Sequence, residues 1–258
     1  MNKNKTSLDP IFAHELFDFF RNHLRTLRDF NYSKNKVSIS HQVIIPLATY
    51  SPWEDDKVFL DLYHNISKNT LVDKYRCYEL YSFLVKNKHL TGNVIEIGVW
   101  KGGTSAVLCK ALEIVEQKAK VHLIDTFEGV VKSGEKDTRY KGGEHFDTSI
   151  ELVNEFLNSL NVKNYTIFKG IFPEEVAIPL NEKKYRLCHI DVDTYDSAKD
   201  SFEAIWPYME NGGAVIFDDY GFWGCEGVTE FCNGLVLKDG VVLYNLNGHA
   251  ILIKVLSF

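Results

Sequence analysis

From residue 93 onward, short apolar runs alternate with stretches of helical spacing, and this alternation limits the possible folds more than any other feature. The predicted strands cover residues 93–99, 120–125, 165–169, 185–191, 214–218, 241–246 and 250–255. The predicted helices cover residues 103–117, 148–160, 197–209 and 225–235. Such alternation is typical of βαβ units, and a short turn between the last two strands predicts a hairpin. We therefore expect an α/β fold with a seven-stranded, mostly parallel sheet and an antiparallel last strand.

The first 90 residues show helical spacing but no strand pattern. Apolar side chains recur at helical spacing between residues 9 and 29, where Asp9 is the expected N-cap and Pro10 suits the first helical position. Two further helices are predicted over residues 55–66 and 73–86. The chain is therefore expected to comprise an N-terminal helical extension, residues 1–90, and an α/β domain, residues 91–258. The apolar first helix predicts a homo-oligomer, either a dimer or a larger assembly.

The composition excludes several classes of protein. The 29 basic and 35 acidic residues give a formal net charge of −6, so the chain lacks an overall positive field for nucleic acid or an anionic membrane. No apolar run reaches the roughly 18 residues that a membrane-spanning helix needs. Five irregularly spaced cysteines without a C-x-x-C pair indicate reduced thiols rather than a disulfide framework. The predicted location is the cytoplasm.

A turn rich in glycine, residues 96–104, closes the first strand of the domain and opens the next helix. Glycine lets a ligand approach the backbone closely, and the first N–H groups of a helix are free to bind it. The turn lacks the G-x-G-x-x-G spacing with which dinucleotide folds bind a pyrophosphate. Glu96 favours a cationic ligand, such as the sulfonium and amino group of S-adenosylmethionine. A tight turn needed only for folding is the alternative.

Asp125 ends the second strand of the domain, where a carboxylate can accept hydrogen bonds from both ribose hydroxyls of an adenosine group. This role is the same for NAD and S-adenosylmethionine, so Asp125 supports nucleoside binding without choosing between them. An NAD-linked oxidoreductase therefore remains an alternative at this point. A turn or helix-capping role for Asp125 is the purely structural interpretation.

Three aspartates follow two predicted strands that are neighbours in a doubly wound sheet. Asp191 ends the fourth strand, and Asp218 and Asp219 end the fifth. Neighbouring strands lie about 4.8 Å apart, so these carboxylates are expected to crowd together and to repel one another unless a proton or a cation intervenes. A hard divalent ion with oxygen ligands, Mg²⁺, is the predicted solution. Asp193 is expected to point away, because side chains alternate along a strand.

This arrangement suits methyl transfer to a hydroxyl oxygen. A sugar hydroxyl is a weak acid, and a bound metal ion lowers its pKa and fixes its position. A carboxylate that contacts both the metal and the hydroxyl can accept the proton. Asp191 is best placed for this role, because it is expected at the junction of the cofactor and metal sites.

These residues resemble the macrocin O-methyltransferase family, the metal-dependent class I methyltransferases that modify sugar hydroxyls of macrolides and aminocoumarins. The resemblance extends from about residue 49 to residue 254. It is carried by residues 49–53, 69–73, 76–80, 96–104, 125–132, 140–145, 169–173, 189–193, 212–221 and 245–249. It implies a Rossmann-like class I methyltransferase sheet, an S-adenosylmethionine-dependent O-methyltransferase activity, and a role for the extension in covering the substrate and cofactor.

The resemblance also implies roles for individual residues. The cofactor would contact Leu71, Val72, Glu96, Gly98, Thr104, Asp125, Gly170 and Ile171. Mg²⁺ would bind Asp191, Asp218 and Asp219, with Asp191 as the base. Residues 131–149 look like the family's mobile lid, and Tyr50 lies where the family contacts the acceptor sugar. His145 is a second candidate base or a substrate contact, or else a packing residue of the lid.

The composition bears on the acceptor. The chain has 23 lysines and 6 arginines, a bias typical of AT-rich genomes, whereas antibiotic producers are commonly GC-rich. A surface-glycan precursor in polysaccharide biosynthesis is therefore favoured over a macrolide as the small-molecule acceptor. A phosphate-type or nucleotide-linked acceptor is an alternative, because the predicted lid carries Lys132, Lys136, Arg139 and Lys141. A non-catalytic interaction protein that kept the fold is a further alternative, which the three intact aspartates disfavour.

Overall fold

The computed structural model describes residues 9, 11–12, 15–16, 18–20, 50–115, 118–176, 184–245 and 247–255. The chain forms two compact units, residues 1–50 and residues 51–258. In the first unit the Asp9 carboxylate accepts hydrogen bonds from the backbone N–H groups of Ile11 and Phe12, at 2.7 and 3.3 Å. Asp9 therefore caps a helix, as predicted. The rest of the helix predicted over residues 9–29 lies outside the described residues.

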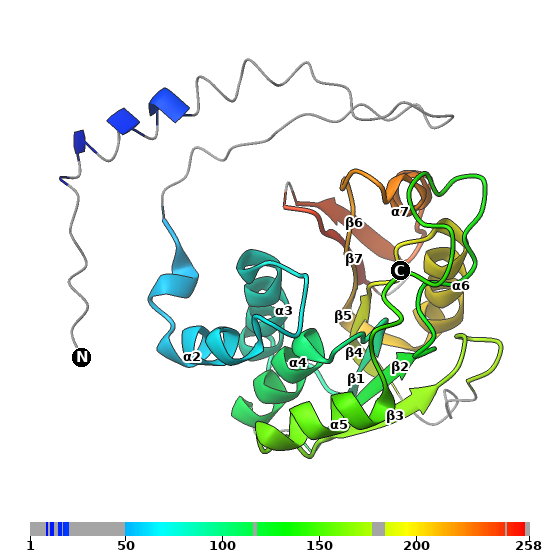
Figure 1. Ribbon diagram of the computed structural model, residues 1–258, viewed down its shortest axis with the longest axis horizontal. Coiled ribbons are helices and arrows are strands. Elements are labelled where there is room, and N and C mark those ends of the chain that lie inside the picture. Colours follow the sequence, from blue (N-terminus) through cyan, green and yellow to red (C-terminus); the bar gives the residue numbers. More distant parts are fainter. Residues whose placement is uncertain are drawn as a thin grey trace. The chain divides into compact units, whose positions relative to one another are not determined.

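Seven strands of the second unit form one sheet in the order β3-β2-β1-β4-β5-β7-β6 (Figure 1). The strands are β1 (Asn93–Ile97), β2 (Val121–Asp125), β3 (Tyr165–Lys169), β4 (Tyr185–Ile190), β5 (Met209–Phe217), β6 (Gly240–Tyr244) and β7 (Ala250–Lys254). The first five strands pair in parallel, and β7 runs antiparallel to both β5 and β6. The predicted sheet is thereby confirmed.

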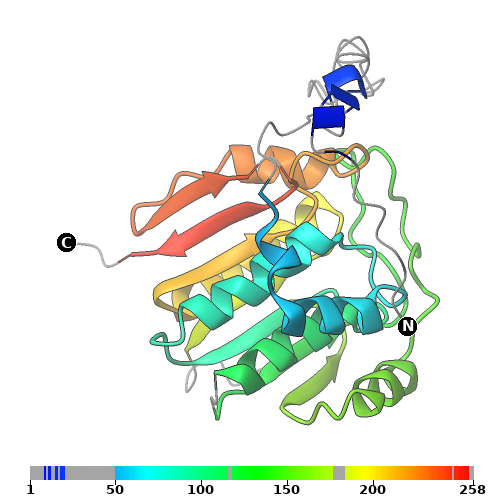
Figure 2. The same cartoon turned by 90° about the vertical axis from the view of Figure 1, so that its left-hand side faces the viewer.

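Helices cover both faces of this sheet, as Figure 2 shows for the face nearer the viewer. They are α2 (Lys57–Ile66), α3 (Lys74–Lys86), α4 (Gly103–Ile114), α5 (Ile150–Ser159), α6 (Tyr195–Ile205) and α7 (Glu226–Asn233), with short 3₁₀ turns η1 (Pro52–Glu54) and η3 (Trp206–Tyr208). Helices α2–α5 pack on one face and share a core with Val94, whereas α6 and α7 pack on the other face with Ile95. This division follows from the alternation of side chains along β1.

Short polar side chains cap the first turns of α2, α3 and α5. The Asp73 carboxylate accepts hydrogen bonds from the backbone N–H groups of Tyr75 and Arg76, at 2.9 and 3.0 Å, and so caps α3. Asp56 caps α2 and Ser149 caps α5 in the same way. These caps set the rotation of α3, which decides which of its side chains reach the sheet.

Helices α2 and α3 are part of the same compact unit as the sheet. Phe59 of α2 and Leu80 of α3 are fully buried in the core that α4 completes. The compact unit that contains the sheet begins at Ser51, because the apolar faces of α2 and α3 pack against α4, and the predicted division at residue 90 stays a prediction.

Two strands end directly before the predicted aspartates. β4 ends at Ile190 and β5 ends at Phe217, so Asp191 and Asp218 are the first residues beyond neighbouring parallel strands. β5 begins at Met209, five residues earlier than predicted, because its glycines hide the strand pattern in the sequence. Among the described residues, no helix is both long and apolar enough to cross a membrane.

Candidate active site

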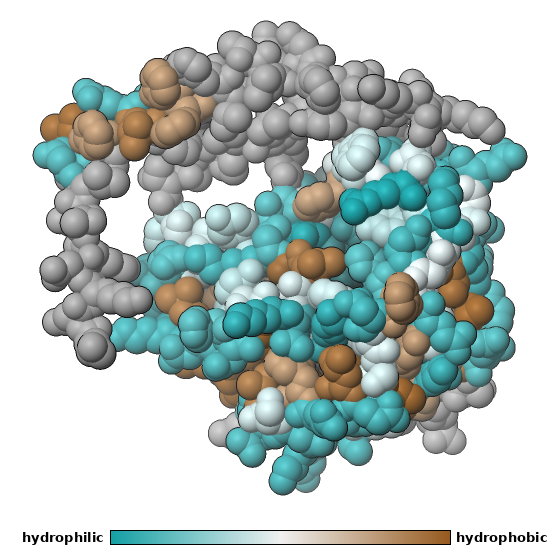
Figure 3. Space-filling model, viewed as in Figure 1, coloured by the Kyte–Doolittle hydropathy of each residue, from teal (hydrophilic) through white to brown (hydrophobic). Residues whose placement is uncertain are grey.

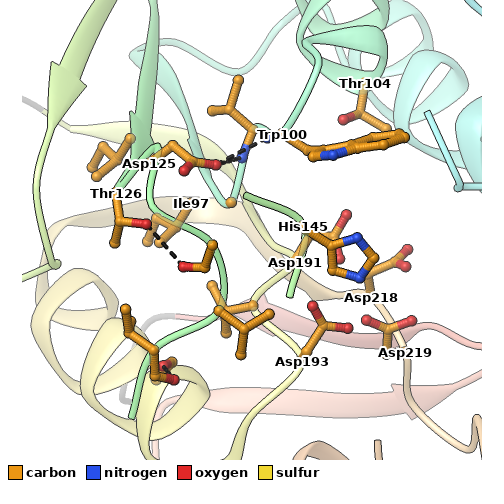
Figure 4. Close-up of a pocket in the computed structure, with 18 of the residues that line it drawn as sticks. Ile97, Trp100, Thr104, Asp125, Thr126, His145, Asp191, Asp193, Asp218 and Asp219 are labelled. Atoms are coloured by element: carbon orange, nitrogen blue, oxygen red, sulfur yellow. Dashed lines mark hydrogen bonds between the residues drawn. The ribbon is translucent and has the colours of Figure 1, made fainter. Parts of the chain in front are cut away.

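A pocket opens at the carboxyl ends of the parallel strands, at the edge where the topology of such a sheet places ligands (Figure 4). Its lining includes Gly98 after β1, Asp125 at the end of β2, Gly170 after β3, Asp191 after β4 and Asp218 after β5. The pocket has two chemically different ends. Asp125 and the glycine turn form one end, which we call the turn end, and four aspartates gather at the other, the acidic end (Figure 4).

Gly98 shapes the turn end because no other residue fits its position. Its φ is +91°, and a Cβ atom there would lie 1.7 Å from the backbone oxygen of Asp191. The backbone N–H of Asp191 donates to the carbonyl oxygen of Ile97 at 2.9 Å. The glycine turn therefore lies directly against the first residue of the acidic end, which joins the two ends in one pocket.

Asp125 holds the turn in shape through backbone hydrogen bonds. Its Oδ2 accepts from the N–H groups of Val99 and Trp100 at 2.7 and 2.9 Å (Figure 4). Its Oδ1 accepts from the N–H of Phe127 at 2.6 Å. A carboxylate offers about four acceptor positions, so capacity remains for one ligand hydroxyl. The structural role is observed, and the predicted ribose contact stays a prediction.

The remaining residues predicted at the cofactor divide into those that line the pocket and one that does not. The lining includes Leu71, Val72, Thr104, Gly170 and Ile171. Leu71 is 68% exposed and Val72 is buried, so the segment before α3 presents both an accessible and a packed side chain. The structure thus brings these five residues together around one pocket, and their predicted contacts with the cofactor stay predictions.

Glu96 is not among the pocket-lining residues of the described chain. It is fully buried, accepts a hydrogen bond from the Ser105 hydroxyl, and lies with Oε1 3.1 Å from Nδ1 of His189. Side chains alternate along β1, so the pocket side of the strand belongs to Ile97. The predicted contact of Glu96 with a sulfonium stays a prediction that this placement does not support.

The predicted trio of aspartates does come together at the acidic end. Asp191, Asp218 and Asp219 each offer a carboxylate oxygen, and these oxygens lie within 4.8 Å of one another. Burial and the charge of Asp218 raise the pKa values of Asp191 and Asp219 well above the ordinary range. An all-oxygen donor set that resists full ionisation fits a hard divalent cation such as Mg²⁺.

Arg76 brings a positive charge to this end, which the sequence analysis missed. Its side chain is 6% exposed, it contacts Asp218 Oδ2 through Nη1, and Nη1 lies 3.8 Å from Asp219 Oδ1. Its Nε donates to Asp73 Oδ2 at 3.0 Å, so the cap of α3 also orients the guanidinium. Burial lowers the pKa of Arg76, but Asp218 and the other nearby carboxylates outweigh this effect and raise it.

Two buried histidines face Asp218 from behind the pocket. Nε2 of His249 lies 2.9 Å from Asp218 Oδ1, and Nε2 of His189 lies 3.8 Å from the same oxygen. Burial opposes charge on these groups, yet Asp218 and Glu96 raise the pKa of His189 to about 10. Burial would raise the pKa of Asp218, but the histidines and Arg76 lower it. Asp218 is therefore the carboxylate that stays ionised.

Asp193 corrects the sequence analysis. It lines the pocket, with its Oδ1 3.8 Å from the thiol of Cys225, and its carboxyl takes part in a hydrogen bond with Tyr140. Strand alternation, which predicted that it points away, does not apply, because β4 ends at Ile190 and Asp193 has a φ of +63°. The acidic end therefore has a fourth aspartate (Figure 4).

His145 also lines the pocket and lies beside the aspartates in Figure 4. Its ring centroid is 6.0 Å from that of Trp100 and 5.8 Å from that of Tyr140, so aromatic neighbours hold it. Tyr50, the predicted acceptor contact, belongs to the first unit and is 72% exposed. The roles of both residues stay predictions.

The predicted lid, residues 131–149, forms neither helix nor strand. Its backbone is fastened at several points, including a hydrogen bond from the Thr194 hydroxyl to the carbonyl oxygen of Val131 at 3.0 Å. Three of its four basic side chains already have partners: Lys132 with Asp200 and Glu174, Lys136 with Glu230, and Lys141 with the carbonyl oxygen of Asp137. Arg139 is exposed and lies over the rings of Tyr140 and Trp223.

Comparison with known proteins agrees with this geometry. The family described as Macrocin-O-methyltransferase (TylF) matches residues 62–241. Demethyldecarbamoylnovobiocin O-methyltransferase of Streptomyces niveus is 27% identical over 152 residues, 53% of this chain and 55% of that protein. A 4'-O-methyltransferase of Streptomyces olivaceus, named for 8-demethyl-8-(2,3-dimethoxy-alpha-L-rhamnosyl)-tetracenomycin-C, is 27% identical over 157 residues, 55% of this chain and 58% of that protein. These alignments span little more than half the length of the relatives.

Two solved structures show the same fold. The O-methyltransferase NovP has a TM-score of 0.61 and 21% identity, with 72% of this chain and 82% of that chain covered. The calicheamicin methyltransferase CalS11 has a TM-score of 0.59 and 19% identity, with 84% of this chain and 99% of that chain covered. At this level of identity, the likeness establishes the arrangement of strands and helices.

Proposed function

Since the chain belongs to the macrocin O-methyltransferase family, we propose that it transfers a methyl group from S-adenosylmethionine to a hydroxyl group of a sugar-containing small molecule. One observation carries the proposal: the turn end and the acidic end belong to a single pocket, because the Gly98 turn lies against the backbone of Asp191. A methyl donor at the first end and an acceptor hydroxyl at the second would then meet in one place.

We propose that Mg²⁺ is held by Asp191, Asp218 and Asp219. The proximity of their oxygens supports this, and so do the raised pKa values of Asp191 and Asp219, since crowded carboxylates gain most from a cation. When bound, the ion would lower the pKa of an acceptor hydroxyl.

Asp191 is the proposed base. It lies where the glycine turn meets the acidic end, so it is the carboxylate placed closest to both the proposed donor and the proposed acceptor. His145 is the second candidate, because it lines the pocket beside the aspartates. Asp125 orients the turn, and Leu71 with Val72 would exclude water from one side of the donor.

The acceptor is proposed to be a surface-glycan precursor. The lysine-rich composition supports this, and the name of the tetracenomycin relative supports a sugar-bearing acceptor in general. A phosphate-type or nucleotide-linked acceptor has less support, because three of the four basic lid residues are engaged by protein groups. Arg139 beside Trp223 is the feature that would favour it.

The assembly and location are also proposed. Described apolar residues of the first unit are exposed, among them Ile11 at 72% and Phe12 at 52%, which favours burial in a homo-oligomer (Figure 3). The five cysteines are free and buried, which supports a reducing compartment, the cytoplasm. We propose neither a nucleic acid nor a membrane as a partner.

The test is an acceptor screen that measures release of S-adenosylhomocysteine, with and without EDTA. Glycan precursors should support release, EDTA should abolish it, and Mg²⁺ should restore it. A thermal-shift comparison should show stabilisation by S-adenosylmethionine and none by NAD. Stabilisation by NAD alone would contradict the proposed function, whereas release that survives EDTA would contradict only the role of Mg²⁺.

A further inference from the structure

Asp218 is the most constrained carboxylate of the acidic end. Its side chain is 2% exposed, and both of its oxygens have partners: Arg76 contacts Oδ2, and Nε2 of His249 lies 2.9 Å from Oδ1. Arg76 reaches it from the pocket, whose lining includes that side chain. His249 is fully buried and, among the described residues, is not part of the pocket lining. The two partners therefore hold different oxygens of the same carboxylate.

The ring of His249 is itself held from behind. Its Nδ1 contacts Oε2 of Glu79 on α3, and this oxygen also accepts from Nδ2 of Asn245 at 2.5 Å. The backbone closes the same turn, because Asn245 Oδ1 accepts from the N–H of His249 at 3.0 Å. The turn between β6 and β7 is thus joined to α3 through one carboxylate, and its imidazole has a fixed orientation.

The chemistry of the ring follows from its partners. Both nitrogens face carboxylate oxygens, which can only accept when ionised, so the ring donates a hydrogen bond from each side. A carboxylate anchored in this way keeps one rotamer, with its remaining acceptor positions in a fixed direction. Metal ligands in proteins are commonly oriented by such outer contacts, whose loss typically lowers metal affinity about 10- to 100-fold.

We propose that Glu79 and His249 form a positioning pair that fixes Asp218 for cation binding from outside the pocket. The proposal rests on the proposed function, because it takes Asp218 as a ligand of the cation. Neither residue lines the pocket in the part of the chain that the structure describes, so neither is expected to contact substrate. Residues 170 positions apart thereby determine one ligand of the site.

The sign of the effect separates positioning from simple electrostatics. Removal of a positively charged ring near a cation site raises cation affinity if the ring acts only through its charge. Removal of a positioning contact lowers it instead. A general loss of structure would lower cation affinity and S-adenosylmethionine affinity together. Measurement of both affinities in the same variants therefore identifies the role.

The experiment titrates the full-length protein with Mn²⁺, followed by electron paramagnetic resonance, and measures S-adenosylmethionine binding by calorimetry. His249→Asn keeps an amide near Nδ1 but loses the contact with Asp218, whereas His249→Gln can place an amide near Nε2. We expect Mn²⁺ affinity to fall about 10- to 100-fold in His249→Asn and less in His249→Gln and Glu79→Gln. S-adenosylmethionine affinity should stay close to that of the wild type in all three.

His122→Gln is the matched control. His122 of β2 is likewise a buried histidine, with Nδ1 2.9 Å from the Tyr185 hydroxyl, so its replacement disturbs a histidine contact that does not involve Asp218. Its Mn²⁺ affinity should be unchanged. Equal or tighter Mn²⁺ binding by a folded His249→Asn variant overturns the proposal, and so does a parallel loss of both affinities.

Failure of the proposed function looks different. If the wild-type protein binds S-adenosylmethionine but no Mn²⁺, it has no cation site. That result would contradict both the positioning role of Glu79 and His249 and the role of Mg²⁺. If His249→Asn does not fold, Glu79→Gln and His249→Gln decide the question, because both keep a side chain of similar size and can preserve one hydrogen bond.

Discussion

The turn end and the acidic end of the pocket are built in different ways. At the turn end, Asp125 binds backbone N–H groups of the adjacent strand connection, and Gly98 is required by a backbone contact. At the acidic end, Asp218 is held by side chains from α3 and from the turn between β6 and β7. The first end depends on backbone geometry, and the second depends on buried charges that compensate one another.

This difference has a physical cause. Backbone groups are present in every sequence, so a glycine and one carboxylate are enough to shape the turn. A buried carboxylate needs partners of opposite charge or hydrogen-bond donors, and these come from wherever the fold places them. The two ends should therefore respond independently to substitution.

The largest expected effect lies at the acidic end. Asp191→Asn removes the proposed base and should lower kcat about 10²- to 10⁴-fold, with S-adenosylmethionine affinity nearly unchanged. Single-turnover rates and calorimetry measure the two quantities. An equal loss of affinity would show that the two ends are not separable.

The next largest effect is expected at the turn end, on the stability of the folded protein. Gly98→Ala should lower the free energy of unfolding by about 2–4 kcal/mol, because strain at positive φ adds to a clash with the Asp191 backbone. Gly143→Ala is the control, since Gly143 has a φ of +87° but nothing within 4 Å of an added Cβ, and should cost only about 1 kcal/mol. Urea denaturation measures the free energy of unfolding of both variants. Equal losses would mean that the contact of position 98 with the Asp191 backbone is unimportant.

A smaller effect is expected when Asp125 is changed. Asp125→Asn keeps one acceptor oxygen but loses the charge and part of the backbone hydrogen bonding, so S-adenosylmethionine affinity should fall about tenfold. Mn²⁺ affinity should not change. Calorimetry and Mn²⁺ titration on one preparation give both numbers, and a change in Mn²⁺ binding would contradict the independence of the ends.

The smallest effect concerns the segment over the pocket. Burial lowers the pKa of Lys132, but hydrogen bonds to Asp200 and Glu174 outweigh it and raise the pKa above 10.5. The ion pairs of Lys132 therefore stabilise the folded state fully below pH 10.5, the pKa of an unperturbed lysine. Their contribution is lost as the pH rises through the higher pKa that Lys132 has in the folded state. Lys132→Met should cost less than about 1 kcal/mol at any pH from 6 to 9. A cost that varies within that range would contradict the assignment.

Much of the fold follows from local patterns. The alternation of strands with helices predicts the element order, and the hairpin turn predicts the antiparallel β7. The approach of Asp191 to Asp218 was predictable because parallel neighbouring strands end at the same edge. The orientation of Asp193 was not, because it lies beyond the strand, where alternation no longer holds.

The sheet, the glycine turn and the meeting of three aspartates could be predicted from residue order alone, because each depends on the residue types within one strand and its connection. The groups that stabilise those aspartates became apparent only once the folded arrangement of α3 and the last hairpin was known. Arg76, Glu79 and His249 lie in segments that carry the family resemblance, but nothing local in them points to Asp218, since α3 and the turn between β6 and β7 meet there only after the chain has folded. A buried charge requires compensation, but the sequence does not say which distant residue supplies it.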